Sequence, residues 1–263
     1  MRVARAFDLV GVALISLAVR LAHALFLSRT PFFEGPIIDA YTYRTFGERL
    51  AATGDFGGAF YQPPLYPAFL GLLFAVGCKS AWAVAVVQAL LGSATAALMV
   101  VVGRRLAGRP RDARRVGLAV GLATALYGPL VLYDLELLPP VLVHLLLAVA
   151  LVLSFSTRAV GVVDAALGLL IGLAITGWPL SVAFLPLALA LRSRRLATGR
   201  GRAIGLAMGV VFSAVPLAAT ARHNARHDGE GIVVSYNSGI NLWLGNNPDW
   251  RATWRARPGA EFE

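Results

Sequence analysis

The sequence predicts an all-α polytopic transmembrane helix bundle of about seven spans, with amphipathic interfacial helices in a large first extracytoplasmic loop. Hydrophobic residues make up 57% of its 263 residues and charged residues only 14%, whereas soluble domains carry about a quarter charged residues. Several apolar runs reach roughly 20 residues, the length that a helix needs to cross the hydrocarbon layer. Arginine-rich segments separate these runs, as they do in the loops of membrane proteins.

The formal net charge is +10, which in a soluble protein would suggest a nucleic-acid partner. The arginines fall between apolar runs, however, and no basic face interleaved with stackable aromatic residues is visible, so we expect no nucleic-acid binding. Eleven of the 23 arginines lie in two short segments, 103–115 and 192–202. Short arginine-rich loops of this kind mark the cytoplasmic side of a membrane.

The first predicted span covers residues 7–28 and follows Arg2 and Arg5, which favours a cytoplasmic N-terminus. A cleaved signal peptide is the alternative, but the apolar run is long and Arg20 interrupts it. Arg20 and His23 share a helical face. Because Arg20 lies about 12 Å from the outer end of the span, we expect its side chain to snorkel toward the headgroups rather than to face the bundle interior.

Six further spans are predicted from apolar length. The fifth and sixth are either a helical hairpin or one broken helix, because the sixth is short and begins beside Pro179. His144 stands alone in the fourth span and is expected to form an interhelical hydrogen bond rather than to bind a ligand. The lone Cys78 allows no internal disulfide. The six spans are 82–103, 114–132, 138–156, 160–177, 179–192 and 203–221.

The apolar stretch 66–77 is too short for an ordinary span, so we predict a re-entrant or interfacial helix there. Both arginine-rich segments then lie in the cytoplasm. The first loop, 29–81, and the turn that carries Asp134 and Glu136 face the other side. We therefore divide the chain into a transmembrane region, 1–221, and an extracytoplasmic segment, 222–263, in a protein of the plasma (inner) membrane.

Within the first loop, Asp39 opens a predicted amphipathic helix in which Tyr43, Phe46 and Leu50 share one face. A helix of this kind lies along the membrane surface. Glycines at 54–58 then break the chain, and Pro63 and Pro64 introduce the short apolar helix. The loop is thus expected to hold two helices at the membrane interface.

Five segments, taken in order, resemble the GT-C membrane glycosyltransferases, in particular the bacterial branch related to protein O-mannosyltransferases and the aminoarabinose transferase of lipid A. The resemblance implies a sugar donor carried on a polyprenyl phosphate, an acceptor lipid, glycan or protein, and an acidic residue just after the first span. Relatives continue with further spans, so the resemblance also implies that this chain is an N-terminal part of such a protein. The segments are TPFFEGPIIDAYTYRTFGERLAATGDF (30–56), FYQPPLYPAFLGLLF (60–74), VVQALLGS (86–93), ALYGPLVLYDLELL (125–138) and SYNSGINLWLGNNPD (235–249).

The resemblance places the acidic residue at Asp39. In the transfer that it implies, an acceptor hydroxyl attacks the anomeric carbon of the sugar while the lipid phosphate leaves, and a carboxylate takes the hydroxyl proton as general base. The alternative is structural, because Asp is a favoured helix N-cap and Asp39 stands where the amphipathic helix is expected to begin. Both roles are compatible with one side chain.

Asp134 and Glu136 lie between two apolar runs, on the same predicted side as Asp39. They are candidates for contacting the acceptor or a divalent cation, which Asp39 and Glu136 would hold together. The alternative is that both acids are solvated helix ends. The resemblance favours Glu136, since the family tends to carry an acid there.

The candidate donor-binding residues are those that the resemblance and the first loop place near a lipid phosphate. Relatives often have a lysine where this chain has Gln62, and a glutamine can hydrogen-bond a phosphate but cannot neutralise it. They also carry an arginine-proline pair near Thr176–Pro179, so another arginine, such as Arg222, is a candidate substitute. The alternative for the proline-rich segment is a structural helix entrance. The candidates are Arg20, Tyr43, Tyr61, Gln62, Tyr66 and Arg222.

In the tail, a strand-like run at 232–234 precedes a polar stretch in which Asn237, Asn241 and Asn246 are candidates to border the sugar. A purely structural loop is the alternative. Two rival functions remain open. A transporter or flippase would line its pathway with Arg20 and His144, although no duplicated halves are seen. A noncatalytic membrane scaffold subunit would need no site at all.

Overall fold

The computed structural model describes residues 2–249, and every regular element within them is helical. The prediction of a strand-like run at 232–234 was wrong, because Ile232 has no regular structure and Val233 and Val234 form bends. The polar stretch after it is a helix rather than a loop. The elements are α1 (Arg2–Leu27), α2 (Ile38–Thr53), α3 (Leu65–Ala75), α4 (Ala81–Leu106), η1 (Pro110–Asp112), α5 (Ala113–Leu126), α6 (Gly128–Tyr133), α7 (Pro140–Ser154), α8 (Val162–Gly177), η2 (Pro179–Ala183), α9 (Phe184–Ser193), α10 (Gly199–Ala225) and α11 (Asn237–Asn246).

Three helices in the described part are long and apolar enough to cross a membrane: Ala6–Leu27, Ala81–Leu106 and Gly199–Ala225. They match the predicted spans at 7–28, 82–103 and 203–221 and make the chain a membrane protein. The other four predicted spans coincide with shorter helices. The span at 114–132, for example, is divided into α5 and α6 beside Pro129, whose ring cannot donate a helical hydrogen bond. Seven crossings therefore remain a prediction.

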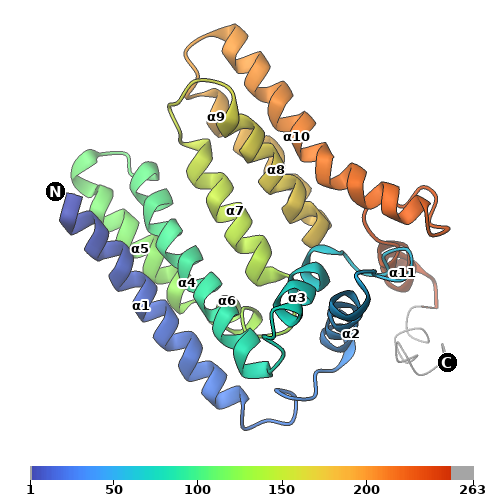
Figure 1. Cartoon of the computed structure of the whole chain (residues 1–263). Coiled ribbons are helices and arrows are strands. Elements are labelled where there is room, and N and C mark those ends of the chain that lie inside the picture. The colour runs from blue at the N-terminus through green and yellow to red at the C-terminus, as the bar shows by residue number, and fades with distance from the viewer. Residues whose placement is uncertain (1, 250–263) are drawn as a thin grey trace.

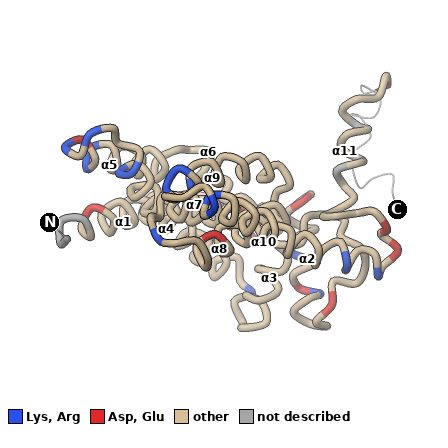
Figure 2. Tube along the Cα trace, turned by 90° about the horizontal axis from the view of Figure 1, so that it is seen from above, with Lys and Arg blue, Asp and Glu red and all other residues tan. Residues whose placement is uncertain are grey.

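Both arginine-rich segments lie at one end of the bundle, together with the N-terminal turns of α1 (Figures 1 and 2). Asp8 of α1 accepts ion pairs from Arg104 of α4 at 2.6 Å and from Arg114 of α5 at 3.0 Å. The helices α2 and α3 lie at the opposite end, where α10 also finishes (Figure 1). The relative placement of basic loops and first-loop helices thus agrees with the prediction.

The helices α8 and α9 form a hairpin rather than one broken helix, the two alternatives left open by the sequence. Arg192 in the last turn of α9 donates to Asp164 in the first turn of α8, with Nε 2.9 Å from Oδ1. A contact between the end of one helix and the start of the other requires antiparallel helices. Arg192 is also 1% exposed, so it is a buried partner rather than a solvated loop charge.

Glycines allow α8 and α10 to pack backbone to backbone. A Cβ at Gly168 would lie 2.2 Å from the carbonyl oxygen of Gly209, and one at Gly172 would lie 2.3 Å from that of Ser213. Gly168 and Gly172 are four residues apart, the spacing by which small residues bring membrane helices into close contact. This spacing is visible in the sequence and is the signal for the α8–α10 contact.

We expect Gly168→Ala to lower the thermal unfolding midpoint in detergent, because the new methyl group meets backbone that cannot rotate away. The expected cost is about 1–3 kcal/mol, typical of overpacking. The matched control is Gly11→Ala in α1, where a Cβ would have no neighbour within 4 Å and alanine is the better helix former. Equal midpoints for the two variants would contradict the proposed close contact.

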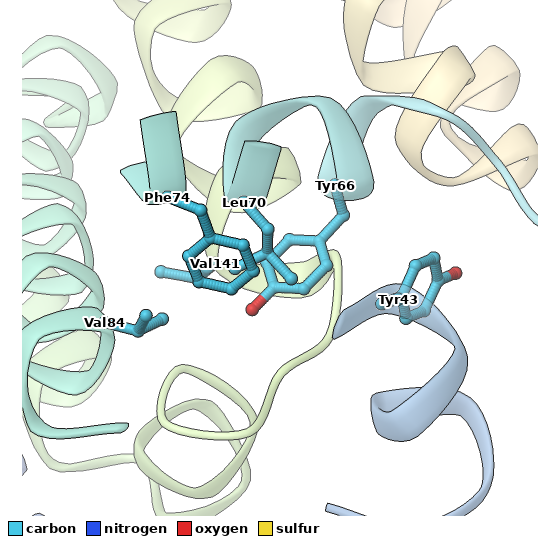
Figure 3. Close-up of a cluster of buried hydrophobic side chains, with 6 residues drawn as sticks. All are labelled: Tyr43, Tyr66, Leu70, Phe74, Val84 and Val141. Atoms are coloured by element: carbon cyan, nitrogen blue, oxygen red, sulfur yellow. The ribbon is translucent and has the colours of Figure 1, made fainter. Parts of the chain in front are cut away.

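The helices α2 and α3 are anchored on the bundle by a buried cluster. Tyr43 of α2 and Tyr66, Leu70 and Phe74 of α3 pack with Val84 of α4 and Val141 of α7 (Figure 3). The amphipathic face predicted for 39–50 is confirmed, with Tyr43 buried and Phe46 and Leu50 half-buried. The short apolar helix is confirmed at Leu65–Ala75, directly after Pro63 and Pro64.

Candidate functional site

Asp39 lies in the first turn of α2, on the surface of the molecule. The expected N-cap role was wrong, because α2 begins at Ile38 and no side chain caps it. The carboxylate instead accepts a hydrogen bond at Oδ1 from Nε2 of Gln62, at 2.8 Å. Oδ2 makes no hydrogen bond within the described residues and is available to a ligand.

The residue before Asp39 is in a strained conformation. Ile38 has φ of +54°, a region that costs L-residues roughly 1–2 kcal/mol and that β-branched side chains rarely adopt. Backbone strain of this kind concentrates at functional sites, where the surrounding structure holds it in place. The strain at Ile38 sets the direction in which the chain enters α2, and so the position of Asp39.

Asp39 and Glu136 line the same open pocket, which has a volume of about 290 Å³. Apolar side chains form most of its remaining wall, including Ile38, Leu132 and Leu138. Residues 97 positions apart in the sequence thus meet at the end of the bundle opposite the arginine-rich segments. Asp134 and Glu136 were both expected to face the same cavity as Asp39. This holds for Glu136 but not for Asp134.

Asp134 is buried and does not reach this pocket. Its Oδ2 accepts from Nε of Arg20 at 2.9 Å and from Nη2 at 2.6 Å, and the two side chains are 3% and 1% exposed. Neither a solvated Asp134 nor a snorkelling Arg20 is therefore correct. Ser16 and the carbonyl of Ala125 accept the remaining donors on Nη1, so the guanidinium is satisfied inside the bundle, and outward snorkelling is unnecessary.

Glycine at position 92 of α4 makes room for this ion pair. A Cβ there would lie 2.3 Å from Oδ2 of Asp134 and 2.4 Å from Nε of Arg20. His144 lies on the other side of the carboxylate, with Nδ1 4.0 Å from Oδ1 of Asp134. Both of these atoms are buried and lack a hydrogen-bond partner in the described residues. We predicted an interhelical hydrogen bond for His144. At 4.0 Å from Asp134 its Nδ1 does not form one, although the nearby group is polar and comes from another segment of the chain.

Gln88, which is fully buried in α4, connects the pocket to the core. Its Nε2 donates to the carbonyl oxygens of Asp134 at 2.9 Å and Glu136 at 3.0 Å, and its Oε1 accepts from the hydroxyl of Tyr66. Every polar atom of the amide is used, which holds the 134–136 turn on α4. Gln88 was not among the predicted site residues, although a lone amide inside an apolar span is a signal of a buried polar role.

The chain after α10 fastens the segment that carries Gln62. The backbone NH groups of Tyr236 and Asn237 donate to the carbonyls of Phe60 and Tyr61, each at 3.1 Å. Asn224 is fully buried, and its Oδ1 accepts from the NH of Phe60 at 2.8 Å. Its Nδ2 donates to the carbonyls of Ile232 and Val234. Asn224 was also missed, because its partners are distant in the sequence.

Two tyrosines near Asp39 remain protonated over the physiological range. Burial raises the pKa of Tyr43, and the negative charge of Asp39 raises it further. The pKa of Tyr61 is raised for the same two reasons, in the same order. Both phenols are therefore neutral, and Tyr61, the less buried of the two, is able to donate a hydrogen bond to a ligand near Asp39.

The remaining predicted residues contribute less to this arrangement. Arg222 is exposed and forms no ion pair within residues 2–249. Asn237 accepts a hydrogen bond from Ser235, and Asn246 donates to the carbonyl of Leu242 within α11. Asn241 is exposed on the same helix. None of the three asparagines lines the Asp39 pocket.

Within the described residues, no three metal-ligating side chains of the His, Cys, Asp or Glu type come together. A cation at Asp39 and Glu136 would have two carboxylates. This number fits Mg²⁺, which often takes one or two carboxylates and completes its shell with water and substrate phosphates. The metal expectation stays a prediction.

Comparisons of this chain with protein-family models, with curated proteins and with solved structures find no match. What the chain does must therefore be argued from its own residues. These place an exposed carboxylate, a second acid and two neutral phenols at one end of a membrane bundle.

Proposed function

We propose that this chain is part of a GT-C-type glycosyltransferase that moves a sugar from a polyprenyl phosphate to a lipid, glycan or protein acceptor. The observation that carries the proposal is the carboxylate of Asp39, which lines the pocket and has one oxygen bound by Gln62 and the other without a hydrogen-bond partner in the described residues. A general base needs this combination of a fixed orientation and a free lone pair. The resemblance of the five sequence segments to this family supports it.

In the proposed reaction the acceptor oxygen forms a bond to the anomeric carbon, and the bond from that carbon to the phosphate oxygen breaks. Asp39 takes the proton of the acceptor hydroxyl, and the lipid phosphate leaves with the bonding electron pair. Gln62 would act as a positioning residue for Asp39 rather than as a phosphate ligand. Glu136, which lines the same pocket, would contact the acceptor or a cation bound to the phosphate.

Fewer residues are proposed to bind the donor than the sequence predicted. Arg20 is omitted, because its guanidinium is closed within a buried ion pair. The same burial removes support from a transport pathway along Arg20. Tyr43 is also buried, whereas Tyr61 and Arg222 remain accessible enough to meet a donor. The proposal places the pocket on the extracytoplasmic face of the plasma membrane, because the arginine-rich end is expected in the cytoplasm.

The test is transfer from labelled polyprenyl-phosphate sugars in membranes that contain the wild-type chain or Asp39→Asn. Asn preserves the shape and can still accept from Gln62, but it cannot take a proton at neutral pH, so we expect transfer to fall about 10²–10⁴-fold. The matched control is Glu34→Gln, an exposed acid five residues away that does not line the Asp39 pocket. Equal transfer by wild type and Asp39→Asn would remove Asp39 as the base.

A further inference from the structure

A second, narrower pocket lies beside the Asp39 pocket and shares Glu136 with it as a wall. Two basic side chains line it, Arg44 of α2 and Lys79, which precedes α4. Most of its other walls are apolar side chains. The larger apolar residues are Leu27, Phe32, Phe33, Pro36, Phe74, Val84, Leu135 and Leu137.

The position of this pocket corresponds to the headgroup layer of a bilayer. Leu27 is the last residue of one candidate span, and Ala81 is the first residue of another, and both line the pocket. A site built from the ends of two spans lies where hydrocarbon gives way to the phosphate groups of lipids. Exposed apolar side chains, including Leu25, Phe26 and Phe32, lead from α1 to this site.

Two basic side chains, Arg44 and Lys79, line the pocket against one acid, Glu136, so its charge favours an anion. Lys79 is exposed and has no ion-pair partner within the described residues. Arg44 is 29% exposed; its Nε donates to Glu48, and its Nη1 donates to the carbonyl of Glu34. Its Nη2 has no acceptor within residues 2–249 and is left to a ligand. Glu48 is more than half exposed, and surface ion pairs of this kind are weak.

We propose that this pocket binds a membrane lipid with an anionic phosphate headgroup. Arg44 and Lys79 hold the phosphate, and the apolar wall holds the first part of the lipid tail. The first residue of α4 lies in the same wall, so the positive end of a 26-residue helix adds to the attraction. The proposal does not depend on the transfer reaction, and it assigns Arg44 and Lys79, which were not among the predicted donor-binding residues.

Lys79 is the only lysine of the chain, so its acylation by an amine-reactive reagent can be followed by mass spectrometry without interference from other lysines. The full chain is placed in nanodiscs of phosphatidylcholine, with or without phosphatidic acid. We expect phosphatidic acid to slow acylation about fivefold, the size of effect that one basic residue gains beside an anionic lipid. Inorganic phosphate added to phosphatidylcholine nanodiscs is expected to give no protection, because it lacks the tail.

Arg44→Gln is expected to remove most of the protection of Lys79. Arg49→Gln, on the same helix but outside the pocket, is expected to retain it. The variant Arg49→Lys supplies a second amine at the same end of the molecule and reports the general effect of an anionic surface. Equal slowing of both amines, or full protection in Arg44→Gln, would overturn the site. Protection by inorganic phosphate alone would overturn the assignment to a lipid.

Discussion

Replacement of Arg20 by methionine is expected to destabilise the protein by about 3–5 kcal/mol, the cost of removing one partner of a buried ion pair. Asp134 would be left 2% exposed without the arginine that pairs with it. The neighbouring His144 lies 4.0 Å away and does not replace two charged hydrogen bonds. The measurement is the free energy of unfolding in mild detergent, followed by denaturant titration.

The double variant Arg20→Met with Asp134→Leu is the control for this experiment. Leucine has the same branching as aspartate, and two apolar side chains of similar volume often replace a buried ion pair at little cost. We therefore expect the double variant to be more stable than Arg20→Met alone. A double variant that loses the sum of the two single losses would show that the pair does not act as a unit.

Arg192→Met is expected to cost a similar amount, about 3–5 kcal/mol, and in addition to release the loop between α7 and α8. Arg192 donates to the carboxylate of Asp164 and also to the carbonyls of Ser156, Arg158 and Ala159. The loss of the guanidinium leaves these acceptors without their donor. We expect faster tryptic cleavage after Arg158 as well as a lower free energy of unfolding.

The two ion pairs should respond differently to a second substitution. Asp164→Leu removes the orphaned carboxylate of Arg192→Met, but it does not supply donors for the three carbonyls. The double variant is thus expected to recover part of the stability and none of the resistance to trypsin. Arg194→Met, an exposed arginine two residues later, is the matched control. Rapid cleavage in that variant as well would show that the loop is not held by Arg192.

The positions of the helices could be predicted from the sequence because apolar length and spacing are local properties. The runs at 7–28, 82–103 and 203–221 became the three long apolar helices, and the face of α2 followed from the helical spacing of Tyr43, Phe46 and Leu50. Proline and glycine marked the start of α3 and the break before it. Each of these features depends on residues within a few turns of one another.

The connections of the site could not be predicted in this way, because they join residues that are distant in the sequence. Arg20 pairs with Asp134 across 114 positions, and Asn224 binds Phe60 across 164. A single arginine in an apolar span is compatible with either snorkelling or burial. Burial is possible here because the packing of the helices brings a carboxylate, Asp134, and the space left by Gly92 next to Arg20.

The sequence by itself determined a helical membrane chain, its apolar segments, the separation of arginines from the first-loop helices and Asp39 as the candidate base. The tertiary structure decided which acid stays at the surface: Glu136 joins Asp39 in the open pocket, whereas Asp134 is withdrawn to Arg20. The reason is that helix formation depends on neighbours along the chain. The burial of a charge, in contrast, depends on whether a partner on another helix satisfies it.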